Sequence, residues 1–501
     1  MTDSSTDRRS LKQSSLGTAS IVFFVVAASA PLVGMTGAVP VAMLLGSGTG
    51  VPGVYLAVGL TLLLFSVGYA AMSHRVTNAG AFFSYVGRGL GIPMGIGSAF
   101  SSILGYIVIQ LAIYGFFGGV TYFTMLSIGI DIPWWAWTLG AWVIVTFLSL
   151  LSVDVGAKIL GTLLTLEVLV LLIAGIGILI DGGPEGWNFA ASFSPGIAFA
   201  GGFAGTAGIA IAFAFASFIG FEATAIYGEE SKDPKRTVPR ATYWAIGIIT
   251  SLFAIVSFAM VTGMGASGLF DQVIERSAVD GEPLADPAAV LFSLAGEYVG
   301  PWLATAMAWL VVTSLFAGLL AFQNASARYF FAMGRGQVLP SFFGTTNGRG
   351  APQAGALATS VIAGLVIITF AIAGLDPVLN LFFWSSAVAV VAIFFVEILV
   401  SIAVVVYFRR EGGENLWRSV IAPIGAAILL GIGLYLLMAR FNLLSGLVAA
   451  GVDPSLPESA WMMNPLGWIL VLLPFIAAVA GIIVANVRKL DENSLTKDVL
   501  S

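Results

Sequence analysis

Apolar stretches recur along the whole chain and are separated by short polar connections. About 20 consecutive apolar residues are the length that a helix needs to cross the hydrocarbon core of a bilayer. The pattern therefore predicts an all-α polytopic membrane protein. We predict twelve transmembrane helices, at residues 17–45, 51–73, 92–121, 134–151, 155–180, 202–227, 240–264, 301–331, 354–374, 379–407, 420–439 and 465–487.

The composition agrees with this prediction. Apolar residues make up 58% of the 501 residues, charged residues make up only 9%, and the mean hydropathy is +0.99. Soluble domains carry roughly 25% charged residues, so a soluble fold is excluded. The absence of cysteine from the sequence also excludes a disulfide framework and thiol chemistry.

The beginning of the chain has the outline of a secretory signal peptide. Basic residues precede the apolar run IVFFVVAA, and Ala28, Ser29 and Ala30 would form the cleavage site. The apolar character nevertheless continues to Leu45, beyond the roughly 7–15 residues of a signal-peptide core. Pro31 would directly follow the cut, which is a poor place for cleavage. We therefore expect an uncleaved first span.

The distribution of basic residues orients the predicted spans. With the N-terminus inside, all but two of the 21 Lys and Arg residues fall on the cytoplasmic side, and the exceptions are Arg276 and Arg440. Cytoplasmic loops carry an excess of Lys and Arg, so the asymmetry supports this arrangement. We expect a multi-pass protein of the plasma (inner) membrane, with cytoplasmic tails at residues 1–16 and 488–501.

Two predicted spans contain helix-breaking or charged residues near mid-membrane. Pro31, Gly34 and Gly37 interrupt span 1, while Gly220 and Glu222 interrupt span 6. The two spans begin two halves of five spans each, and an odd number of spans inverts the second half relative to the first. Paired interruptions at corresponding positions point to the binding site of a secondary transporter.

Unwound backbone gives such a site its chemistry. Free N–H groups at the start of a half-helix attract an anion such as an α-carboxylate. Free carbonyls at the other interruption accept hydrogen bonds from an ammonium group. The two interruptions together therefore predict a receptor for a zwitterion.

Three segments carry a resemblance to a known family. The connection FIGFEATAIYGEESKDPKRTVPRAT, the end of span 8 (ARYFFAMGRGQVLP) and the segment VTNAGAFFSYVGRGLG resemble the amino acid–polyamine–organocation (APC) permeases, although residues 78–80 depart from the Gly-Gly pair of many members. The resemblance implies a LeuT-like 5+5 inverted-repeat fold with alternating access. The transporter core would be residues 17–410, with repeats at about 17–180 and 202–408, followed by spans 11 and 12 within 411–487.

The resemblance also implies a substrate site between spans 1, 3, 6, 8 and 10. Span 1 would offer amides to a carboxylate, and span 6 would offer carbonyls to an amino group. Some members carry a large aromatic gate where this chain has Ala216. The residues carried over by position are Ala30, Pro31, Val33, Gly34, Thr36, Gly37, Gly105, Gln110, Phe215, Ala216, Ser217, Phe218 and Gly220.

Three carboxylates inside predicted spans are candidates for ion or proton coupling. Glu222 follows the interruption of span 6, Glu167 lies in span 5 and Glu397 lies in span 10. An ionisable residue within a membrane span is a functional hypothesis by default. The alternative for Glu222 is a structural cap on loose backbone groups of the broken helix. The charged run from Glu229 to Arg240 is expected to brace the inner face.

Other classes of function fit the sequence less well. A metal enzyme is disfavoured because the chain has one histidine and no clustered ligands with metal-binding spacing, and no P-loop is present. We expect no cofactor, no nucleic-acid partner and no enzymatic activity, while the oligomeric state is left open. Because no Lys or Arg lies in mid-span, we favour neutral or cationic amino acids or amines as substrates. A transporter-like receptor or a polyamine permease is the alternative.

Overall fold

The computed structural model describes residues 17–76, 81–151, 157–222, 224, 231 and 233–488. The predicted N-terminal tail, residues 78–80, nearly all of the predicted C-terminal tail, and Glu229, Glu230 and Lys232 lie outside these residues. The described part of the chain is built from helices, and two isolated β-bridges, Val279–Glu282 and Val448–Met463, are its extended pairings.

The first half contains α1 (Thr18–Ser29), α2 (Pro31–Val33), η2 (Gly34–Ala38), α3 (Val39–Val41), η3 (Ala42–Ser47), η4 (Gly48–Gly50), α4 (Val51–Ser73), α5 (Ala81–Leu90), α6 (Ile92–Leu126), α7 (Trp134–Ser149) and α8 (Ala157–Asp181). The η labels denote 3₁₀ and π helices. The π segments η2 and η3 join α2 and α3 into a helical stretch that begins at Pro31 and is kinked at Gly46, where φ is −113° and ψ is −108°.

The rest of the described chain contains α9 (Phe189–Phe193), α10 (Pro195–Ala198), η6 (Gly202–Ala204), α11 (Ala207–Ala216), α13 (Pro234–Met264), α14 (Leu269–Ser277), α15 (Ala288–Tyr298), α16 (Pro301–Arg335), η8 (Ser341–Gly344), α17 (Gln353–Ile372), η9 (Pro377–Phe382), α18 (Phe383–Glu411), η10 (Trp417–Ile421), α19 (Ala422–Ala439), α20 (Phe441–Ser445), η11 (Pro457–Ser459) and α21 (Pro465–Val487).

Nine helical stretches among the described residues are long and apolar enough to cross a membrane. A tenth results if the bent pair Pro195–Ala204 and Ala207–Ala216 forms one span. The remaining predicted spans correspond to short or interrupted helices: α1 has 12 residues, α7 has 16 and α11 has 10. The chain is therefore a multi-pass membrane protein, and its length and composition alone do not establish the number twelve.

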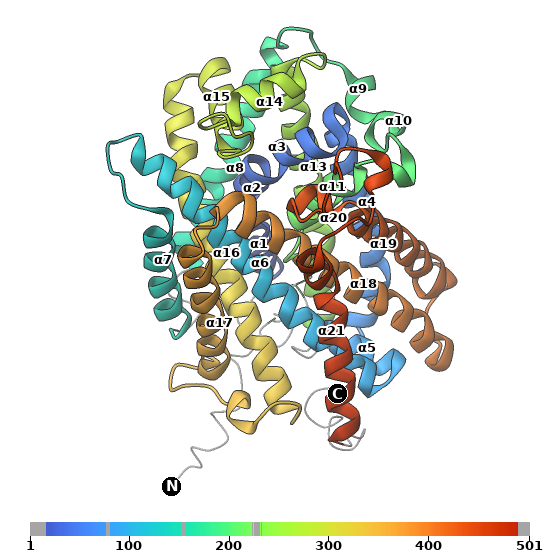
Figure 1. Ribbon diagram of the computed structural model, residues 1–501. Coiled ribbons are helices and arrows are strands. Elements are labelled where there is room, and N and C mark those ends of the chain that lie inside the picture. Colours follow the sequence, from blue (N-terminus) through green and yellow to red (C-terminus); the bar gives the residue numbers. More distant parts are fainter. Residues whose placement is uncertain are drawn as a thin grey trace.

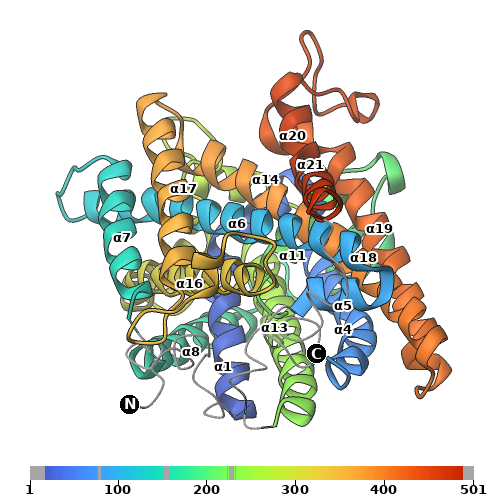
Figure 2. The ribbon, with the colours of Figure 1, turned by 90° about the horizontal axis from the view of Figure 1, so that it is seen from below.

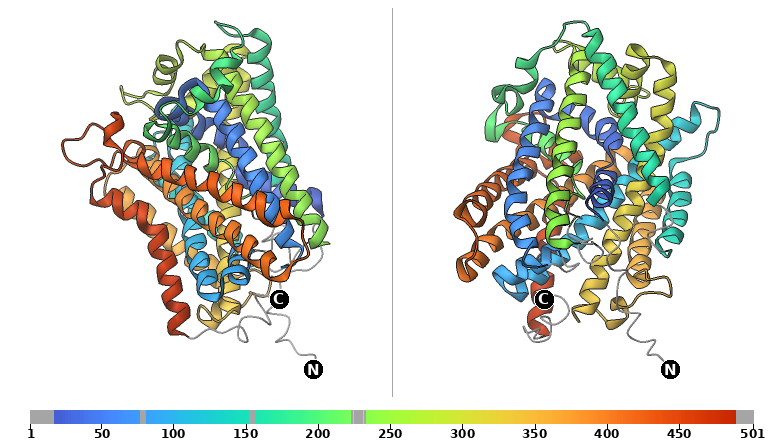
Figure 3. Two further views of the ribbon diagram at one scale, coloured as in Figure 1. Left: turned by 90° about the vertical axis from the view of Figure 1, so that its right-hand side faces the viewer. Right: turned by 180° about the vertical axis from the view of Figure 1, so that it is seen from behind.

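Helix α6 forms the centre of the bundle. It packs against α5, α16, α18 and α21, and the view from below shows it crossing the molecule at a steep tilt (Figure 2). Its 35 residues extend about 50 Å, which exceeds the bilayer core and agrees with such a tilt. Helix α21 packs along α6 at the edge of the bundle, as the left-hand view of Figure 3 shows.

Small residues allow the helices to approach closely. A Cβ atom built on Gly59 of α4 would lie 2.1 Å from the Thr250 hydroxyl oxygen of α13, and one on Gly208 of α11 would lie 2.2 Å from the Leu436 backbone of α19. Apolar surface alone does not drive helices together in lipid, so such close van der Waals packing holds membrane bundles together.

The two ends of the bundle differ. Figure 1 shows the short helices α9, α10, α14 and α15 together at one end, while α21 runs toward the opposite end. The acidic loop between predicted spans 7 and 8 contains α14 and α15, so the first of these ends is the one that the charge pattern assigns to the outside.

Candidate functional site

The first predicted span is interrupted at Ala30. Helix α1 ends at Ser29, Ala30 has the left-handed values φ 42° and ψ 70°, and Pro31 begins the next helix. A left-handed alanine costs roughly 1–2 kcal/mol, so surrounding contacts must hold it in place. Proline suits the first helical position because that N–H has no partner within the helix.

The interruption is shorter than the sequence predicted. Gly34, Thr36 and Gly37 lie within the helical segment η2, and the Gly34 N–H bonds to the Ala30 carbonyl at 3.1 Å. Close packing accounts for Gly37: a Cβ atom there would lie 2.8 Å from the Phe116 ring. This glycine makes room for a neighbouring helix and does not unwind its own.

The sixth predicted span is interrupted after Ala216, where α11 ends. A series of turns follows, and Gly220 has φ 113°, a conformation that glycine adopts without a Cβ clash. The Gly220 N–H donates to Glu222 Oε2 at 2.9 Å. The Glu222 side chain therefore satisfies one of the backbone groups that the interruption frees.

The helical stretch that follows the first interruption meets the start of the second interruption in the interior. A Cβ atom on Gly34 would lie 3.1 Å from the Ser217 hydroxyl oxygen, so span 1 touches the residue that directly follows α11. The Ser217 hydroxyl also lies 3.1 Å from the Tyr55 hydroxyl of α4. A Cβ atom on Gly318 of α16 would lie 3.9 Å from Ala30 Cβ. Four predicted spans thus converge here.

An aromatic cluster packs against η2, the helical segment that follows the interruption of span 1. The Phe116 ring stacks on Phe382 with centroids 4.8 Å apart, and Phe213 contacts Phe382 and Phe383 at 5.9 and 5.7 Å. All four side chains are buried. They come from α6, α11, η9 and α18, so this cluster connects predicted spans 3, 6 and 10.

A polar cluster surrounds Glu222, at the end of the span 6 interruption. The Tyr106 hydroxyl of α6 donates to Glu222 Oε1 at 2.7 Å, and the Tyr69 hydroxyl of α4 donates to the Glu222 carbonyl at 2.7 Å. The Tyr106 ring contacts Tyr329 of α16 at 5.3 Å. Glu222, Tyr106 and Tyr329 are each fully buried.

Both oxygens of the Glu222 carboxyl group face hydrogen-bond donors. Tyr106 donates to one oxygen, and the Gly220 N–H donates to the other. An ionised carboxylate accepts at both oxygens, whereas a protonated one carries a donor that needs an acceptor of its own. A change of protonation state at Glu222 would therefore change the hydrogen bonding of the interruption itself.

Gln110 belongs to a polar network within the helices. Its amide nitrogen donates to Gln323 Oε1 at 2.7 Å, and Gln323 donates to the Ala356 carbonyl at 2.7 Å and the Ser360 hydroxyl at 2.9 Å. Gln110 Oε1 accepts no hydrogen bond from the described residues. One turn further along α6, Ile113 approaches Gly318, so Gln110 lies near the interruption at Ala30.

Several other predicted site residues make helix contacts. A Cβ atom on Gly105 would lie 3.2 Å from Ala392 Cβ of α18, and the Phe215 ring lies 4.1 Å from the Phe394 ring. The Phe218 ring contacts Phe253 of α13 at 5.6 Å. These residues pack the walls around the interruptions, while Ala216 between the two phenylalanines is partly exposed.

The other two predicted carboxylates lie in different surroundings. Glu167 of α8 accepts a hydrogen bond from the Ser314 hydroxyl of α16 at 2.7 Å. Glu397 of α18 is fully buried, and neither of its oxygens has a hydrogen-bond partner among the described residues. The structure therefore does not bring the three candidates into one bonded group. The described residues include no cluster of three metal-ligating side chains.

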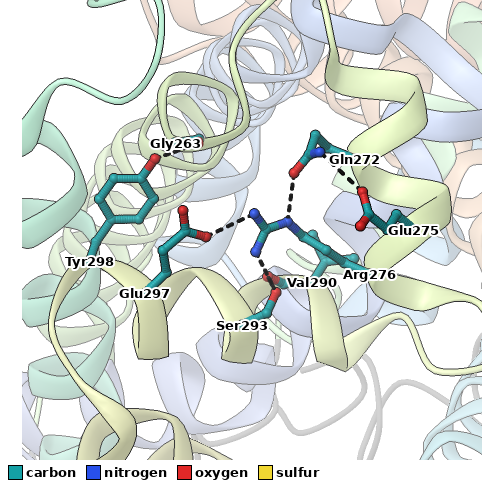
Figure 4. Close-up of polar contacts among 8 residues, drawn as sticks. All are labelled: Gly263, Gln272, Glu275, Arg276, Val290, Ser293, Glu297 and Tyr298. Carbon is teal, nitrogen blue, oxygen red and sulfur yellow. Dashed lines mark hydrogen bonds and ion pairs between the residues drawn. The ribbon is translucent and has the colours of Figure 1, made fainter.

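Helices α14 and α15 cover the site at the end of the bundle where the short helices lie. Helix α15 packs on η2, and α14 packs on η3 and η4. Figure 4 shows how Arg276 of α14 joins the two helices: it donates to Gln272, Ser293 and Glu297, the last at 2.8 Å. Nearby, hydrogen bonds from Ser267 and Ala266 lower the pKa of the exposed Glu185.

The sequence of this chain matches the model of a known protein family. The family model described as amino acid permease matches residues 22–491. The chain belongs to the amino acid permease family. The APC resemblance inferred from the sequence is confirmed, because the match covers almost the whole chain.

Its relatives include permeases of known specificity. The lysine-specific permease LysP of Escherichia coli (strain K12) is 26% identical over 63% of each chain. The branched-chain amino acid permease BcaP of Lactococcus lactis subsp. cremoris (strain MG1363) is 26% identical over 74% of this chain and 77% of that protein. The match with the histidine permease HisP of the same strain spans 64% of HisP, so the alignments to LysP and HisP cover just under two thirds of those proteins.

Solved structures agree on the fold. MhsT, crystallised in complex with L-phenylalanine, has a TM-score of 0.56 and 17% identity, covering 85% of this chain and 100% of MhsT. The manganese transporter of Eremococcus coleocola has a TM-score of 0.54 and 16% identity, covering 98% of this chain and 100% of that chain. The family member described here therefore shares the LeuT fold of these transporters.

Sequence reasoning did not identify several residues at the site. Tyr55, Tyr106 and Gln323 bond to predicted site residues, yet each lies in a long apolar run. Gln323 offered a signal, because an amide inside a membrane helix usually needs a partner. The two tyrosines offered none, because tyrosine is common in membrane helices and only tertiary packing brings their hydroxyls to Ser217 and Glu222.

Proposed function

We propose that this chain is a secondary transporter of α-amino acids or related amines that works by alternating access and has no enzymatic activity. The carrying observation is the close approach of Gly34, one turn into the helical stretch that follows the first interruption, to Ser217 at the start of the second interruption. Membership of the amino acid permease family supports the proposal. The site has no resident cofactor and depends on backbone groups supplied by both halves of the molecule.

The substrate carboxylate binds at the start of the helical stretch that begins at Pro31. Pro31 has no N–H and the Gly34 N–H is already bonded to Ala30, so Leu32 and Val33 supply the free donors of the first turn. The positive end of the helix dipole adds about 0.3–1 kcal/mol, and up to about 2 kcal/mol in a partly buried setting.

The amino group binds opposite, at the end of α11. The N–H groups of Phe218 and Ile219 bond to the Phe215 and Ala216 carbonyls, whereas the Ala214 and Ser217 carbonyls accept no backbone hydrogen bond from the described residues. These two carbonyls are the acceptors that we propose for the amino group. Gln110 Oε1 is a further free acceptor close to Ala30. Neutral and cationic substrates fit this site, because it offers no positively charged side chain to a second carboxylate.

Glu222 couples the site to the movement of the inner half. Protonation removes an acceptor from either Tyr106 or Gly220, and both bonds hold the interruption of span 6. Glu167 with Ser314, and the buried Glu397, are the secondary candidates for a coupling proton or cation. Proton coupling, sodium coupling and exchange are the three modes to be separated by experiment.

We extend the proposal to the number and orientation of the membrane helices. Twelve membrane helices form two inverted repeats, about 17–180 and 202–408, followed by two further helices within 411–487. Spans 1 and 6 are the discontinuous ones, with their breaks at Ala30 and at 217–222. The protein lies in the plasma (inner) membrane with both termini in the cytoplasm, as the distribution of basic residues favours.

An uptake screen in proteoliposomes tests the function. Radiolabelled amino acids and polyamines are offered under a proton gradient, under a sodium gradient, or against preloaded substrate, with empty liposomes as the control. We expect uptake of at least one α-amino acid. Thermal stabilisation by an amino acid without any uptake would mean a receptor, and uptake of polyamines alone would mean an organocation permease.

A further inference from the structure

A cavity opens beside α11. Its volume is about 130 Å³, and it lies between α4, α11, α18 and α19. Phe215 and Phe394 form part of its floor, with 1% and 2% of their surface exposed. Leu429 and Ile432 lie at its rim, with 45% and 37% exposed.

The lining of this cavity suits a hydrocarbon and not a polar solute. Thr61 is the one polar side chain among the described residues that line it, and its hydroxyl donates to the Ala57 carbonyl of its own helix at 2.8 Å. An amino acid would lose its hydration here without gaining partners. A dry cavity of similar volume lined by Leu, Ile and Phe binds benzene in another protein, so the volume is sufficient for apolar carbon.

The position of the cavity identifies its occupant. Ala57 and Thr61 lie six and ten residues after the start of α4, which places them about 9–15 Å along that helix. The hydrocarbon core of a bilayer is about 30 Å thick, so residues at this distance from the α4 N-terminus lie at the level of the acyl chains, in the leaflet next to that N-terminus. Leu56, Leu60 and Ile428 on the neighbouring surface are 39%, 55% and 58% exposed, as expected of side chains that face lipid.

We propose that this cavity binds an acyl chain of a membrane lipid and that the bound chain holds α11 against α18 and α19. Phe215 directly precedes Ala216, the last residue of α11, and its ring contacts Phe394 at 4.1 Å. A shift of α11 therefore changes the cavity, and an occupant resists that shift. The favourable free energy of binding comes from van der Waals contacts that fill the space between side chains, because an acyl chain is already in apolar surroundings in the bilayer.

Photo-crosslinking tests the binding directly. The full chain is reconstituted in phosphatidylcholine nanodiscs that contain a phosphatidylcholine with a diazirine in its acyl chain, and labelled peptides are mapped by mass spectrometry. We expect labelling of the segments around Phe199 and Leu429 to exceed that of other lipid-facing segments. Labelling no higher than at the lipid-facing side of α21 would overturn the proposal.

Matched substitutions test the site. Ala57→Leu fills the cavity, and Ala427→Leu makes the same change at a half-exposed position of α19 outside it. We expect excess labelling to be lost in the first variant and kept in the second. Leu429→Ala widens the rim and should keep or increase labelling, so it tests the site even if Ala57→Leu folds poorly. Unchanged excess labelling in a folded Ala57→Leu variant would contradict the proposal.

The transport consequence rests on the proposed function, whereas the labelling does not. If the wild-type protein transports an amino acid, Ala57→Leu should make its rate insensitive to the acyl-chain length of the surrounding lipid, while Ala427→Leu stays sensitive. If the transport rates of both variants were equally sensitive to acyl-chain length, the bound lipid would have no effect on transport. A chain that is labelled but transports nothing would refute the proposed function and leave the lipid site standing.

Discussion

The hydrogen bond between Tyr106 and Glu222 supports a quantitative prediction. Both side chains are fully buried, and the oxygen–oxygen distance of 2.7 Å is in the range of charge-assisted bonds. Removing such a bond costs about 1.5–3 kcal/mol, because the carboxylate loses a donor and gains no water. We therefore expect Tyr106→Phe to lower the free energy of unfolding by about 2 kcal/mol, or roughly 30-fold in the unfolding equilibrium.

The same substitution should matter less when Glu222 is replaced by glutamine. An amide is neutral, and Tyr106 and the Gly220 N–H face different oxygens of Glu222, only one of which stays an acceptor in glutamine. In the Glu222→Gln background the loss of the hydroxyl should cost about 1 kcal/mol, the value of a neutral hydrogen bond. The double-mutant cycle should then give an interaction energy of about 1 kcal/mol.

Equilibrium unfolding in mixed SDS and detergent micelles, followed by tryptophan fluorescence, measures all four proteins of the cycle. Tyr114→Phe is the matched control, since Tyr114 is buried on the same helix and its hydroxyl bonds to no carboxylate among the described residues. Additivity within about 0.3 kcal/mol would show that the two groups do not interact and would refute the reasoning.

Three further predictions address packing, the polar network and pH. Gly208→Ala should destabilise the protein strongly, because its Cβ atom would lie 2.2 Å from the Leu436 backbone. The control Gly247→Ala should be neutral, because its Cβ atom meets no atom within 4 Å. Thermal unfolding compares the two variants, and equal melting temperatures would contradict the role of close packing at Gly208. Gln323→Leu should lower the free energy of unfolding by about 2–3 kcal/mol, because it leaves the Gln110 amide nitrogen without its 2.7 Å hydrogen bond. A denaturation curve that matches that of the wild type would argue against the polar network. Burial raises the pKa of Asp286, in the loop before α15, to about 6. Because the pKa of Asp286 is higher in the folded state, its contribution to stability is fully present below about 4, the pKa of an unperturbed aspartate, and is lost as pH rises to about 6. Asp286→Asn should therefore flatten the pH dependence of the melting temperature between these values and stabilise the protein at neutral pH. An unchanged pH profile would count against this role.

Hydropathy was sufficient to place the long helices. The predicted limits 465–487 coincide with α21, the predicted start at residue 92 coincides with α6, and the predicted end at residue 439 coincides with α19. These limits follow from length and polarity, which a bilayer imposes on each helix separately. The broken helices depend on contacts between segments, so their limits were predicted less well.

The interruption of span 1 shows why. Glycines at positions 34 and 37 suggested unwinding, yet both are helical, and the chain breaks at Ala30, a residue without turn preference. Whether a glycine breaks a helix or makes room for a neighbour depends on what packs against it, such as Phe116 at Gly37. The partners of Glu222, on helices more than a hundred residues away, were likewise beyond the reach of pattern analysis.

We propose that backbone groups where the helical stretch after Ala30 approaches Ser217 hold the carboxylate and the amino group of a substrate. Calorimetric binding to the purified protein tests it most directly, with the amino acid found by the screen and with the same compound lacking its carboxylate. Gly34→Leu, which would collide with Ser217 and Phe253, is compared with Gly247→Leu, which meets open space. We predict that the amino acid binds to wild type and to Gly247→Leu but not to folded Gly34→Leu, and that the decarboxylated amine binds much more weakly. Full affinity of the amino acid for Gly34→Leu, or equal affinity of wild type for the amine, would contradict the proposed site.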